Sequence, residues 1–405
     1  MSARVFFSGA TLVLPDRLED SRTLVVEDGR IVDFVSGPRD FAAEEVRVHV
    51  PGGFIVPGFV DVHVHGLAGH DVLTPGGVNE VAARLPSTGV TAFCPTSIAC
   101  EAKVLTAFLQ EIAGARQQAA AGHARVLGAH LESNFINPVY AGAQPIGGLR
   151  TPARALAAGA PAAEGRDIVD AILAHRADIS IVTIAAELDG GMGLLQQLVA
   201  AGVRVSLGHS GASFDDARAA IEAGAAHATH LFNRMPPLLH RAPGLAGAVL
   251  ASDAIAAELI CDGQHVHPAM IRMTLAAKGG SRVMAVTDGT AGSGLPRGSH
   301  AALGGRPITV GEVAMLDDGT LAGSVATMNQ VFATLVTRCG LGLREASEIC
   351  SATPARELGL VGFGVMVAGA VADLAILDAN LVPVQTWIQG QPAWPGTSPG
   401  RPPSS

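Results

Sequence analysis

The chain has 405 residues, of which 48% are hydrophobic and 16% are charged, and its formal net charge is −9. This composition predicts a large folded core and excludes a disordered chain, and the acidic balance argues against an electrostatic nucleic-acid binder. We expect no membrane span, because the sequence lacks a run of about 18 uncharged apolar residues. The N-terminal apolar stretch is broken at Ser8-Gly9, so we also expect no signal peptide. An odd number of cysteines, mostly in apolar runs, indicates free thiols in the cytoplasm: Cys94, Cys100, Cys261, Cys339 and Cys350.

Short strands are predicted at both ends of the chain, separated by Gly, Asp and Pro turns. They cover residues 5–8, 23–27, 30–36 and 46–50 at one end, and 372–377 and 383–389 at the other. We expect residues 1–56 and 362–394 to pair into one small β-sandwich domain. The remaining residues, 395–405, are rich in Pro and Ser, which predicts a disordered tail.

The middle of the chain, residues 57–361, alternates short apolar runs with Ala-rich helical segments. The runs are at 55–63, 91–96, 125–132, 180–187, 204–209, 227–232, 257–261 and 282–288; helices are predicted at 101–121, 167–176, 214–223 and 268–277. Continuously apolar strands that alternate with helices are typical of a parallel sheet covered on both faces. Eight such units predict an α/β fold of the (β/α)8 TIM-barrel type, with seven or nine strands as the alternatives.

Polar side chains close five of these apolar runs. In a (β/α)8 barrel the carboxyl ends of the strands form the rim that carries the active site. A polar group at the end of a buried strand also needs a partner there. The residues are His63, His65, Glu132, His209, His230 and Asp288.

These residue types favour a metal centre. The spacing of His63 and His65 directs both imidazoles to one side of a strand. Glu132 could bridge two ions, and His209 and His230 could bind the second. Imidazole and carboxylate ligands suit divalent metals, so we expect one or two ions per chain, Zn²⁺ or Fe²⁺ first and Mn²⁺ or Co²⁺ as alternatives.

A carboxylated lysine bridges the two metals in many barrel hydrolases of this kind, but the chain has only two lysines. Lys103 falls in a predicted helix and Lys278 in a predicted loop before Gly279-Gly280. We therefore expect Glu132 to provide the bridge. Glu187 ends the fourth run but fits no ligand geometry, and we expect it to make a structural hydrogen bond.

Several motifs together resemble the N-acetylglucosamine-6-phosphate deacetylases of the amidohydrolase superfamily. They span nearly the whole predicted barrel in the order of that family, and the flanking β domain also fits. The motifs are PGFVDVHVHG at 57–66, GAHLE at 128–132, GHS at 208–210, THLFN at 229–233, RAPGL at 241–245, DGQHV at 262–266, VTD at 286–288 and LAGS at 321–324.

The resemblance implies a role for each matching residue. Glu132, His209 and His230 correspond to core metal ligands, and His63 and His65 to ligands of a second ion. Asp288 corresponds to the general acid and base, and His265 to the residue that contacts the sugar and polarises the acetyl carbonyl. Substrate contacts are implied for Gln144 and, around the phosphate, for Asn233, the backbone of Arg234, and Arg241.

Three departures from the family pattern put the exact sugar in doubt. Ser133-Asn134 replaces Gly-Pro after Glu132, and Arg234 replaces a small residue after Asn233. The segment after Asp288 is also richer in Gly than usual. All three lie in loops expected to shape the sugar pocket, and the hydrolytic residues are retained.

The residue types are consistent with amide hydrolysis. Asp288 could accept a proton from a metal-activated water and deliver it to the leaving amine, while His265 or a metal stabilises the oxyanion. Asp288 could instead be a passive ligand or a satisfied carboxylate, and His265 a core histidine. Arginine is suited to bidentate phosphate binding, which favours Arg234 and Arg241 as phosphate ligands over ordinary surface residues.

The expected product is glucosamine 6-phosphate, with acetate. A homodimer is also expected, because Met235, Leu238 and Leu239 would form an exposed apolar stretch beside Arg241, and the matching family arginine reaches across a dimer. Alternatives are a deacetylase of N-acetylgalactosamine 6-phosphate or of an unphosphorylated amino sugar, a cyclic amidase, an N-acyl-amino-acid hydrolase, and a non-catalytic binding scaffold. The absent bridging lysine counts against a cyclic amidase, and the retained ligands count against a scaffold.

Overall fold

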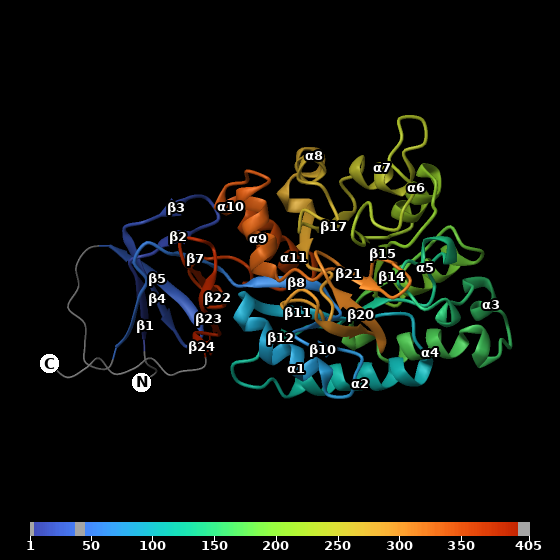
Figure 1. The fold of residues 1–405 in the computed structure, drawn as a ribbon, viewed down its shortest axis with the longest axis horizontal. Helices are drawn as coiled ribbons and strands as arrows, with labels where there is room; N and C mark the ends of the chain where they lie inside the picture. Colours follow the sequence, from blue (N-terminus) through green and yellow to red (C-terminus); the bar gives the residue numbers. More distant parts are fainter. Residues whose placement is uncertain (1–3, 37–44, 396–405) are drawn as a thin grey trace.

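A computed structural model describes residues 4–36 and 45–395. A small β domain lies at one side of the molecule and a large α/β barrel at the other (Figure 1). The predicted tail at 395–405 falls outside the described residues except for its first residue. None of the helices in the described ranges is long and apolar enough to cross a membrane.

The small domain is a sandwich of two sheets built from both chain ends, as predicted. One sheet has the order β5-β4-β1-β6 and the other β24-β23-β22-β7-β2-β3. Phe7 from the first sheet packs edge-on against Trp387 from the second, with ring centroids 5.0 Å apart. The strands are β1 (Val5–Ser8), β2 (Thr11–Val13), β3 (Leu18–Glu19), β4 (Arg22–Glu27), β5 (Arg30–Ser36), β6 (Val46–His49), β7 (Phe54–Pro57), β22 (Leu374–Leu377), β23 (Pro383–Ile388) and β24 (Gln391–Trp394). The domain boundaries themselves remain a prediction.

The barrel has eight parallel strand positions, which confirms the predicted count. The third position is shared by two short strands, β12 and β13. In chain order the strands are β8 (Phe59–Val64), β11 (Val90–Ser97), β12 (Arg125–Val126), β13 (Ala129–Glu132), β14 (Ile179–Ile184), β15 (Arg204–Leu207), β16 (His227–Ala228), β17 (Ala256–Ile260) and β18 (Val283–Val286).

The run at 55–63 was predicted as one barrel strand, but it divides at Gly58. Its first half, β7, pairs with β22 in the sandwich, and its second half, β8, pairs with β11 in the barrel. A Cβ atom on Gly58 would lie 2.3 Å from the side chain of Thr91, so only glycine allows this close approach.

Helices surround the strands, and several of them bury an apolar stripe. In α2, for example, Leu105, Phe108, Leu109 and Ile112 are buried at helical spacing. The helices are α1 (Gly77–Arg84), α2 (Ala102–Gln117), α3 (Pro152–Leu156), α4 (Arg166–Ala174), α5 (Gly191–Ala200), α6 (Phe214–Glu222), α7 (Gly244–Leu250), α8 (Pro268–Lys278), α9 (Met328–Thr337), α10 (Leu343–Ser347) and α11 (Thr353–Glu357). Two short strands that follow β8, β9 (Gly66–Leu67) and β10 (His70–Asp71), form a separate antiparallel pair.

A three-stranded antiparallel sheet after β18 was not predicted. It consists of β19 (His300–Leu303), β20 (Arg306–Val310) and β21 (Ala314–Leu316). Its apolar side chains form a small cluster with Ile98 at the end of β11. This sheet brings Leu303 to the rim of the barrel, where it lines the pocket described below.

The barrel closes between β8 and β18 through a seam of individual hydrogen bonds, since no strand ladder joins these two strands in the described ranges. Thr287 Oγ donates to Asp61 Oδ2 at 2.6 Å, and the amide of His65 donates to the carbonyl of Gly289 at 2.8 Å. Asp61 is fully buried, and burial raises the pKa of this carboxyl to about 7 despite its hydrogen bonds. The seam therefore depends on the buried carboxyl of Asp61 and on the groups that donate hydrogen bonds to it, such as the Thr287 hydroxyl.

We predict that Thr287→Val lowers the free energy of unfolding by about 1–3 kcal/mol, because it keeps the shape of the side chain but leaves a buried oxygen of Asp61 without its hydroxyl donor. Urea unfolding in a chelating buffer measures this without a contribution from metal binding. Thr337→Val is the control, since that hydroxyl is exposed and bonds only within its own helix, to Ala333. Equal stability of the two variants would contradict the prediction.

Candidate metal centre

Three of the predicted site residues lie in left-handed backbone conformations directly after barrel strands. The φ angles are 46° for His209, 30° for His230 and 49° for Asp288. Such angles are rare for residues other than glycine and cluster at functional sites. They also explain why β15 and β16 end before the predicted limits at 209 and 232: the chain turns at the rim and aims these side chains inward.

Glu132, His209 and His230 form a compact buried cluster. Glu132 Oε1 lies 2.9 Å from His209 Nε2 and 2.8 Å from His230 Nε2, and the two ring nitrogens are 3.0 Å apart. Burial alone would raise the pKa of Glu132, but the two imidazoles hold it well below its ordinary value. The carboxylate is therefore ionised and faces both nitrogens.

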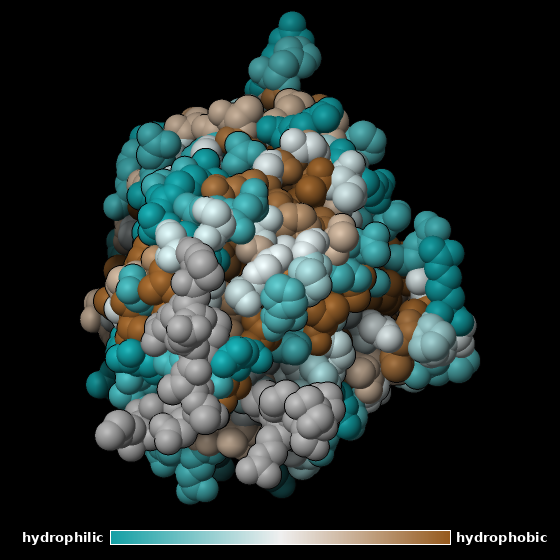
Figure 2. All heavy atoms as spheres, turned by 90° about the vertical axis from the view of Figure 1, so that its left-hand side faces the viewer, coloured by the Kyte–Doolittle hydropathy of each residue, from teal (hydrophilic) through white to brown (hydrophobic). Residues whose placement is uncertain are grey.

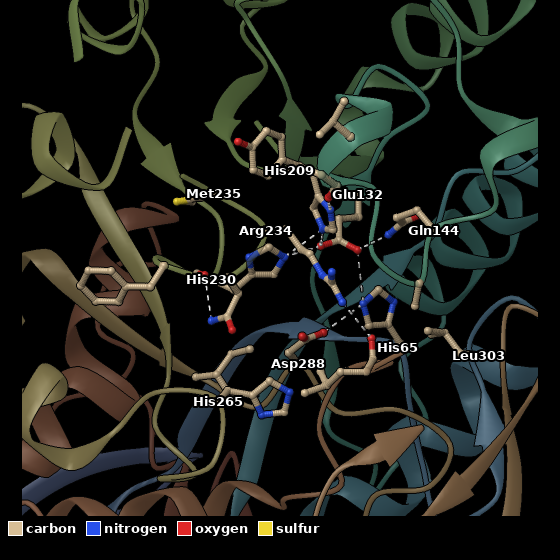
Figure 3. Close-up of a pocket in the computed structure, with 18 residues that line it drawn as sticks. His65, Glu132, Gln144, His209, His230, Arg234, Met235, His265, Asp288 and Leu303 are labelled. Carbon is tan, nitrogen blue, oxygen red and sulfur yellow. Dashed lines mark hydrogen bonds and ion pairs between the residues drawn. The ribbon is translucent and has the colours of Figure 1, made fainter. Parts of the chain in front are cut away.

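His63, His65 and Asp288 form a second cluster beside the first. Figure 3 shows His65 and Asp288 of this cluster next to Glu132. The Nε2 atoms of His63 and His65 are 3.2 Å apart, and Asp288 Oδ1 lies 3.4 Å and 3.2 Å from them. Glu132 also faces this pair, with its oxygens 3.6 Å from His63 Nε2 and 3.7 Å from His65 Nε2. Glu132 thus lies between the two clusters, as expected of a bridging carboxylate.

The outer nitrogens of three of these imidazoles contact groups that only accept hydrogen bonds. His65 Nδ1 lies 3.0 Å from the carbonyl of Thr96, and His209 Nδ1 lies 2.8 Å from that of Tyr140. His63 Nδ1 lies 2.9 Å from the carboxylate of Glu258. Each Nδ1 therefore carries a proton, so loss of the Nε2 proton gives a neutral ring whose free lone pair points into the cluster. The converging nitrogens and carboxylate oxygens can then surround a divalent cation.

Glu258 and His130 support the cluster from below and were not identified from the sequence. Glu258 is fully buried, and although burial raises its pKa, His130 and His63 lower it below the ordinary value. His130 contacts the carbonyl of Val62 at 3.0 Å and the hydroxyl of Thr183 at 2.8 Å, and burial lowers its pKa to about 4. Both ring nitrogens of His130 have partners and Glu258 Oε2 contacts His63, whereas Glu258 Oε1 is buried without a hydrogen-bond partner among the described residues. These contacts place the pair behind His63, on the side away from Glu132 and Asp288. The sequence did contain one indication of this role: Glu258 is a carboxylate inside the otherwise apolar strand β17.

A pocket of about 460 Å³ opens beside the clusters and is lined by several other predicted residues. Gln144 donates from Nε2 to Glu132 Oε2 and accepts from the amide of Ala99 at 2.8 Å, so it also fixes the carboxylate. His265 Nδ1 contacts Asp262 Oδ2 at 2.6 Å. Although burial opposes it, this contact raises the pKa of His265. His265 Nε2 is buried and has no hydrogen-bond partner within the described part of the chain.

The predicted phosphate ligands differ in their position relative to the pocket. Asn233 and Arg234 line the pocket, and the guanidinium of Arg234 has only a 3.5 Å contact, to the carbonyl of Leu321. Arg241 is exposed and lies outside the pocket, where it contacts the neighbouring ring of His240 at 2.8 Å. It belongs to the loop between β16 and α7, which rises above the rest of the molecule in Figure 1. The same projection stands at the top of Figure 2.

Neither lysine is near the clusters, in agreement with the sequence argument. Lys103 lies in α2, as predicted. Lys278 was predicted in a loop but is the last residue of α8, and its amino group donates to the carbonyls of Val249 and Ser252 at 2.9 Å and 2.5 Å. Glu187 accepts from Ser210 Oγ at 2.7 Å and from the amide of Gly211 at 2.6 Å, which confirms its structural role.

We predict that Glu258→Gln weakens Zn²⁺ binding by about 10- to 100-fold, because it removes the negative charge that supports the His63 imidazole. Chelator competition measures the affinity. Glu222→Gln is the matched control, since that carboxylate forms only an exposed pair with Arg218 on α6. Unchanged affinity in Glu258→Gln would contradict a supporting role for this residue.

Known proteins resemble this chain over most of its length. Residues 54–403 match the family model described as the amidohydrolase family. The chain is 34% identical to an N-acetylglucosamine-6-phosphate deacetylase of Lysinibacillus sphaericus, covering 94% of this chain and 95% of the relative. It is 32% identical to an N-acetylgalactosamine-6-phosphate deacetylase of Escherichia coli O157:H7, covering 92% and 97%.

Solved structures with the same architecture lead to the same group. An N-acetylglucosamine-6-phosphate deacetylase from Pasteurella multocida superposes with a TM-score of 0.86 at 25% identity, over 96% of this chain and 99% of the other. A mutant deacetylase from Mycobacterium smegmatis, solved in complex with N-acetyl-D-glucosamine-6-phosphate, superposes with a TM-score of 0.84 at 30% identity, over the same shares of the two chains. The chain therefore belongs to the amidohydrolase family, in the branch that contains the N-acetylglucosamine-6-phosphate deacetylases.

Proposed function

We propose that this chain is a metal-dependent deacetylase that hydrolyses N-acetylglucosamine 6-phosphate to glucosamine 6-phosphate and acetate. The observation that carries the proposal is the convergence of imidazole lone pairs and two carboxylates at the base of a pocket with an arginine in its wall. The names of the relatives support the substrate. The phosphorylated substrate and the five free thiols of the described chain support a cytoplasmic location.

The proposed ligands are His63, His65, Glu132, His209 and His230, with Glu132 shared between two ions. Zn²⁺ and Fe²⁺ suit this mixture of nitrogen and oxygen donors, and Mn²⁺ or Co²⁺ are the alternatives. A bound divalent ion supplies a water whose pKa is lowered to roughly 7 and polarises the scissile carbonyl. Metal analysis of the purified chain tests the number of ions.

Asp288 is the proposed proton carrier. Burial would raise the pKa of its carboxyl, but His63 and His65 lower it below the ordinary value, so the group is ionised at neutral pH. An ionised carboxylate in the wall of the pocket can accept a proton from the attacking water and then transfer it to the nitrogen of the leaving amine as the C–N bond breaks.

His265 is the proposed donor to the substrate. Its contact with Asp262 keeps a proton on Nδ1, and its buried Nε2 lacks a partner among the described residues. Because the pKa of His265 is raised, the ring is more often protonated near neutral pH than an ordinary histidine. A protonated Nε2 at this position can donate a hydrogen bond to the acetyl oxygen as negative charge develops there.

Two arginines compete for the phosphate. Arg234 is on the pocket wall of its own chain, whereas Arg241 is on the projecting loop and outside its own pocket. Leu238 and Leu239 are 38% and 54% exposed on that loop, which supports an interface in a homodimer, although Met235, expected to be exposed with them, is buried. We therefore propose that Arg241 serves the pocket of a second copy, with Asn233 and Arg234 contributing from the same chain.

A panel of N-acetylated hexosamines, each with and without a 6-phosphate, tests the proposed function. Fastest hydrolysis of N-acetylglucosamine 6-phosphate is expected. Preference for N-acetylgalactosamine 6-phosphate or for an unphosphorylated sugar would reassign the substrate within the same chemistry. Turnover of none of them by the metal-loaded chain would contradict the proposal and favour a different amide substrate or a binding scaffold.

We predict that Asp288→Asn lowers kcat by about 100-fold or more, since the amide keeps the shape of the carboxylate but cannot accept the proton. The control is Asp253→Asn, which changes an exposed carboxylate in the turn between α7 and β17. Steady-state kinetics on correctly folded, metal-loaded protein gives the comparison. Turnover near that of the parent protein would reject Asp288 as the proton carrier.

The trans role of Arg241 predicts complementation between two inactive chains. When Arg241→Ala and Asp288→Asn chains exchange subunits, a mixed dimer contains one pocket with both lesions and one intact pocket, so activity returns. If Arg241 acts within its own chain, every pocket carries a lesion and activity stays lost. Native mass spectrometry confirms the exchange independently. No recovery after confirmed exchange would transfer the phosphate role to Arg234 or to Arg241 in the same chain.

A further inference from the structure

A second cavity lies at the opposite end of the barrel from the metal clusters. Its volume is about 410 Å³, and it is lined by three arginines together with Ser180 and apolar side chains such as Leu358 and Leu360. Arg125 and Arg204 begin β12 and β15, so the cavity sits at the amino ends of the strands. Glu132, by contrast, ends β13 at the catalytic rim. The two sites therefore share no side chain.

Two of the three arginines in this cavity have an acidic partner outside its lining, and Arg204 has none among the described residues. Among the described residues that line it there is no carboxylate, although the chain as a whole carries a net charge of −9. Arg116 is paired from outside, with Asp178 Oδ1 at 2.5 Å. Arg204 has neither an ion pair nor a side-chain hydrogen bond within residues 4–36 and 45–395, so its positive charge faces the cavity uncompensated.

Arg125 is held in place but is not satisfied. Its guanidinium stacks on the ring of Phe363, 4.9 Å from the centroid. Its Nη2 forms an ion pair with Asp373 Oδ2 at 3.6 Å, a distance too long for a hydrogen bond. Nε and Nη2 are buried with no hydrogen-bond partner in the described chain. Buried N–H groups of a charged side chain are costly to leave unpaired, so a ligand that accepts hydrogen bonds would be favoured here.

We propose that this arginine cavity binds a small phosphate-bearing molecule, through Arg125 and Arg204. Planar guanidinium groups hold phosphate oxygens in bidentate fashion, and the Ser180 hydroxyl can add a donor. The volume is within the range of small-molecule sites, and the apolar wall leaves room for an organic group attached to the phosphate. The proposal does not rest on the deacetylase activity, because no residue of the metal centre takes part.

Arginine-specific labelling tests the proposal at the site itself. The full-length, metal-loaded chain is treated with phenylglyoxal at constant ionic strength, and modification of each arginine is followed by mass spectrometry. We expect saturating inorganic phosphate to slow the labelling of Arg125 and Arg204 by about tenfold, whereas chloride has no effect. Arg176 is the internal control, since it is exposed and contacts only the carbonyl of Leu173. No protection of Arg125 and Arg204 would overturn the proposal.

Three probes identify the ligand class. Glycerol 3-phosphate that protects at least as well as inorganic phosphate points to an organic phosphate ester, and stronger protection by inorganic phosphate points to the free ion. Either result supports the proposal. Citrate that protects as well as both would overturn the choice of phosphate, since the cavity would then hold oxyanions in general.

Calorimetry with variants separates binding from a purely structural role. In a chain whose catalytic pocket carries Arg234→Gln and Arg241→Gln, further substitution Arg204→Met should weaken phosphate binding by about tenfold or more, while Arg176→Met should not. Arg125→Met provides a second variant if Arg204→Met does not fold. Altered urea unfolding with unchanged phosphate affinity in either variant would mean that these arginines only stabilise the base of the barrel.

Discussion

The convergence of lone pairs at Glu132 is the interaction on which the rest of this structure depends. Imidazole nitrogens and carboxylate oxygens lie between 2.8 and 3.7 Å from one another in a buried site. Three of the four rings are held by a contact to Nδ1: Thr96 and Tyr140 offer carbonyls to His65 and His209, and Glu258 offers a carboxylate to His63. These contacts place a proton on Nδ1 of each of these three rings, so Nε2 is the nitrogen that can bind a cation.

The barrel seam and the metal centre are parts of one construction. β8 carries His63, and the segment after β18 carries Asp288, yet these two strands are joined by single hydrogen bonds rather than by a ladder. Asp61, two residues before His63, accepts the Thr287 hydroxyl one residue before Asp288. The bond that closes the barrel therefore also sets the distance between a proposed ligand and the proposed proton carrier. Burying the Asp61 carboxyl costs free energy of folding. Its position two residues before His63 gives a reason for the carboxyl to be retained.

The two ends of the barrel differ in chemistry as well as in direction. The catalytic rim concentrates histidines and carboxylates, three of them on residues with left-handed backbone, whereas the amino ends of β12 and β15 carry the guanidinium groups of Arg125 and Arg204. Arg234 adds a positive charge to the catalytic pocket at a position where the family has a small residue. Its freedom from close partners fits a side chain that meets an anionic substrate, and this departure bears on which sugar phosphate the pocket accepts.

The sequence alone predicted the barrel, the sandwich and the residues that the structure brings together as candidate metal ligands. Periodic apolar runs report strands and helices directly, and His63, His65, Glu132, His209 and His230 each close such a run. The tertiary structure decided what local patterns cannot encode. Glu258 and His130 read as ordinary members of buried strands, and only the closure of the barrel reveals that one supports His63 and the other packs beside it. The break at Gly58 depends on the approach of Thr91, a residue 33 positions away. Likewise, Arg241 follows β16 and His230 in the sequence but lies outside the pocket. The direction of the backbone after a turn is set by packing between distant parts of the chain, which a local sequence pattern does not show.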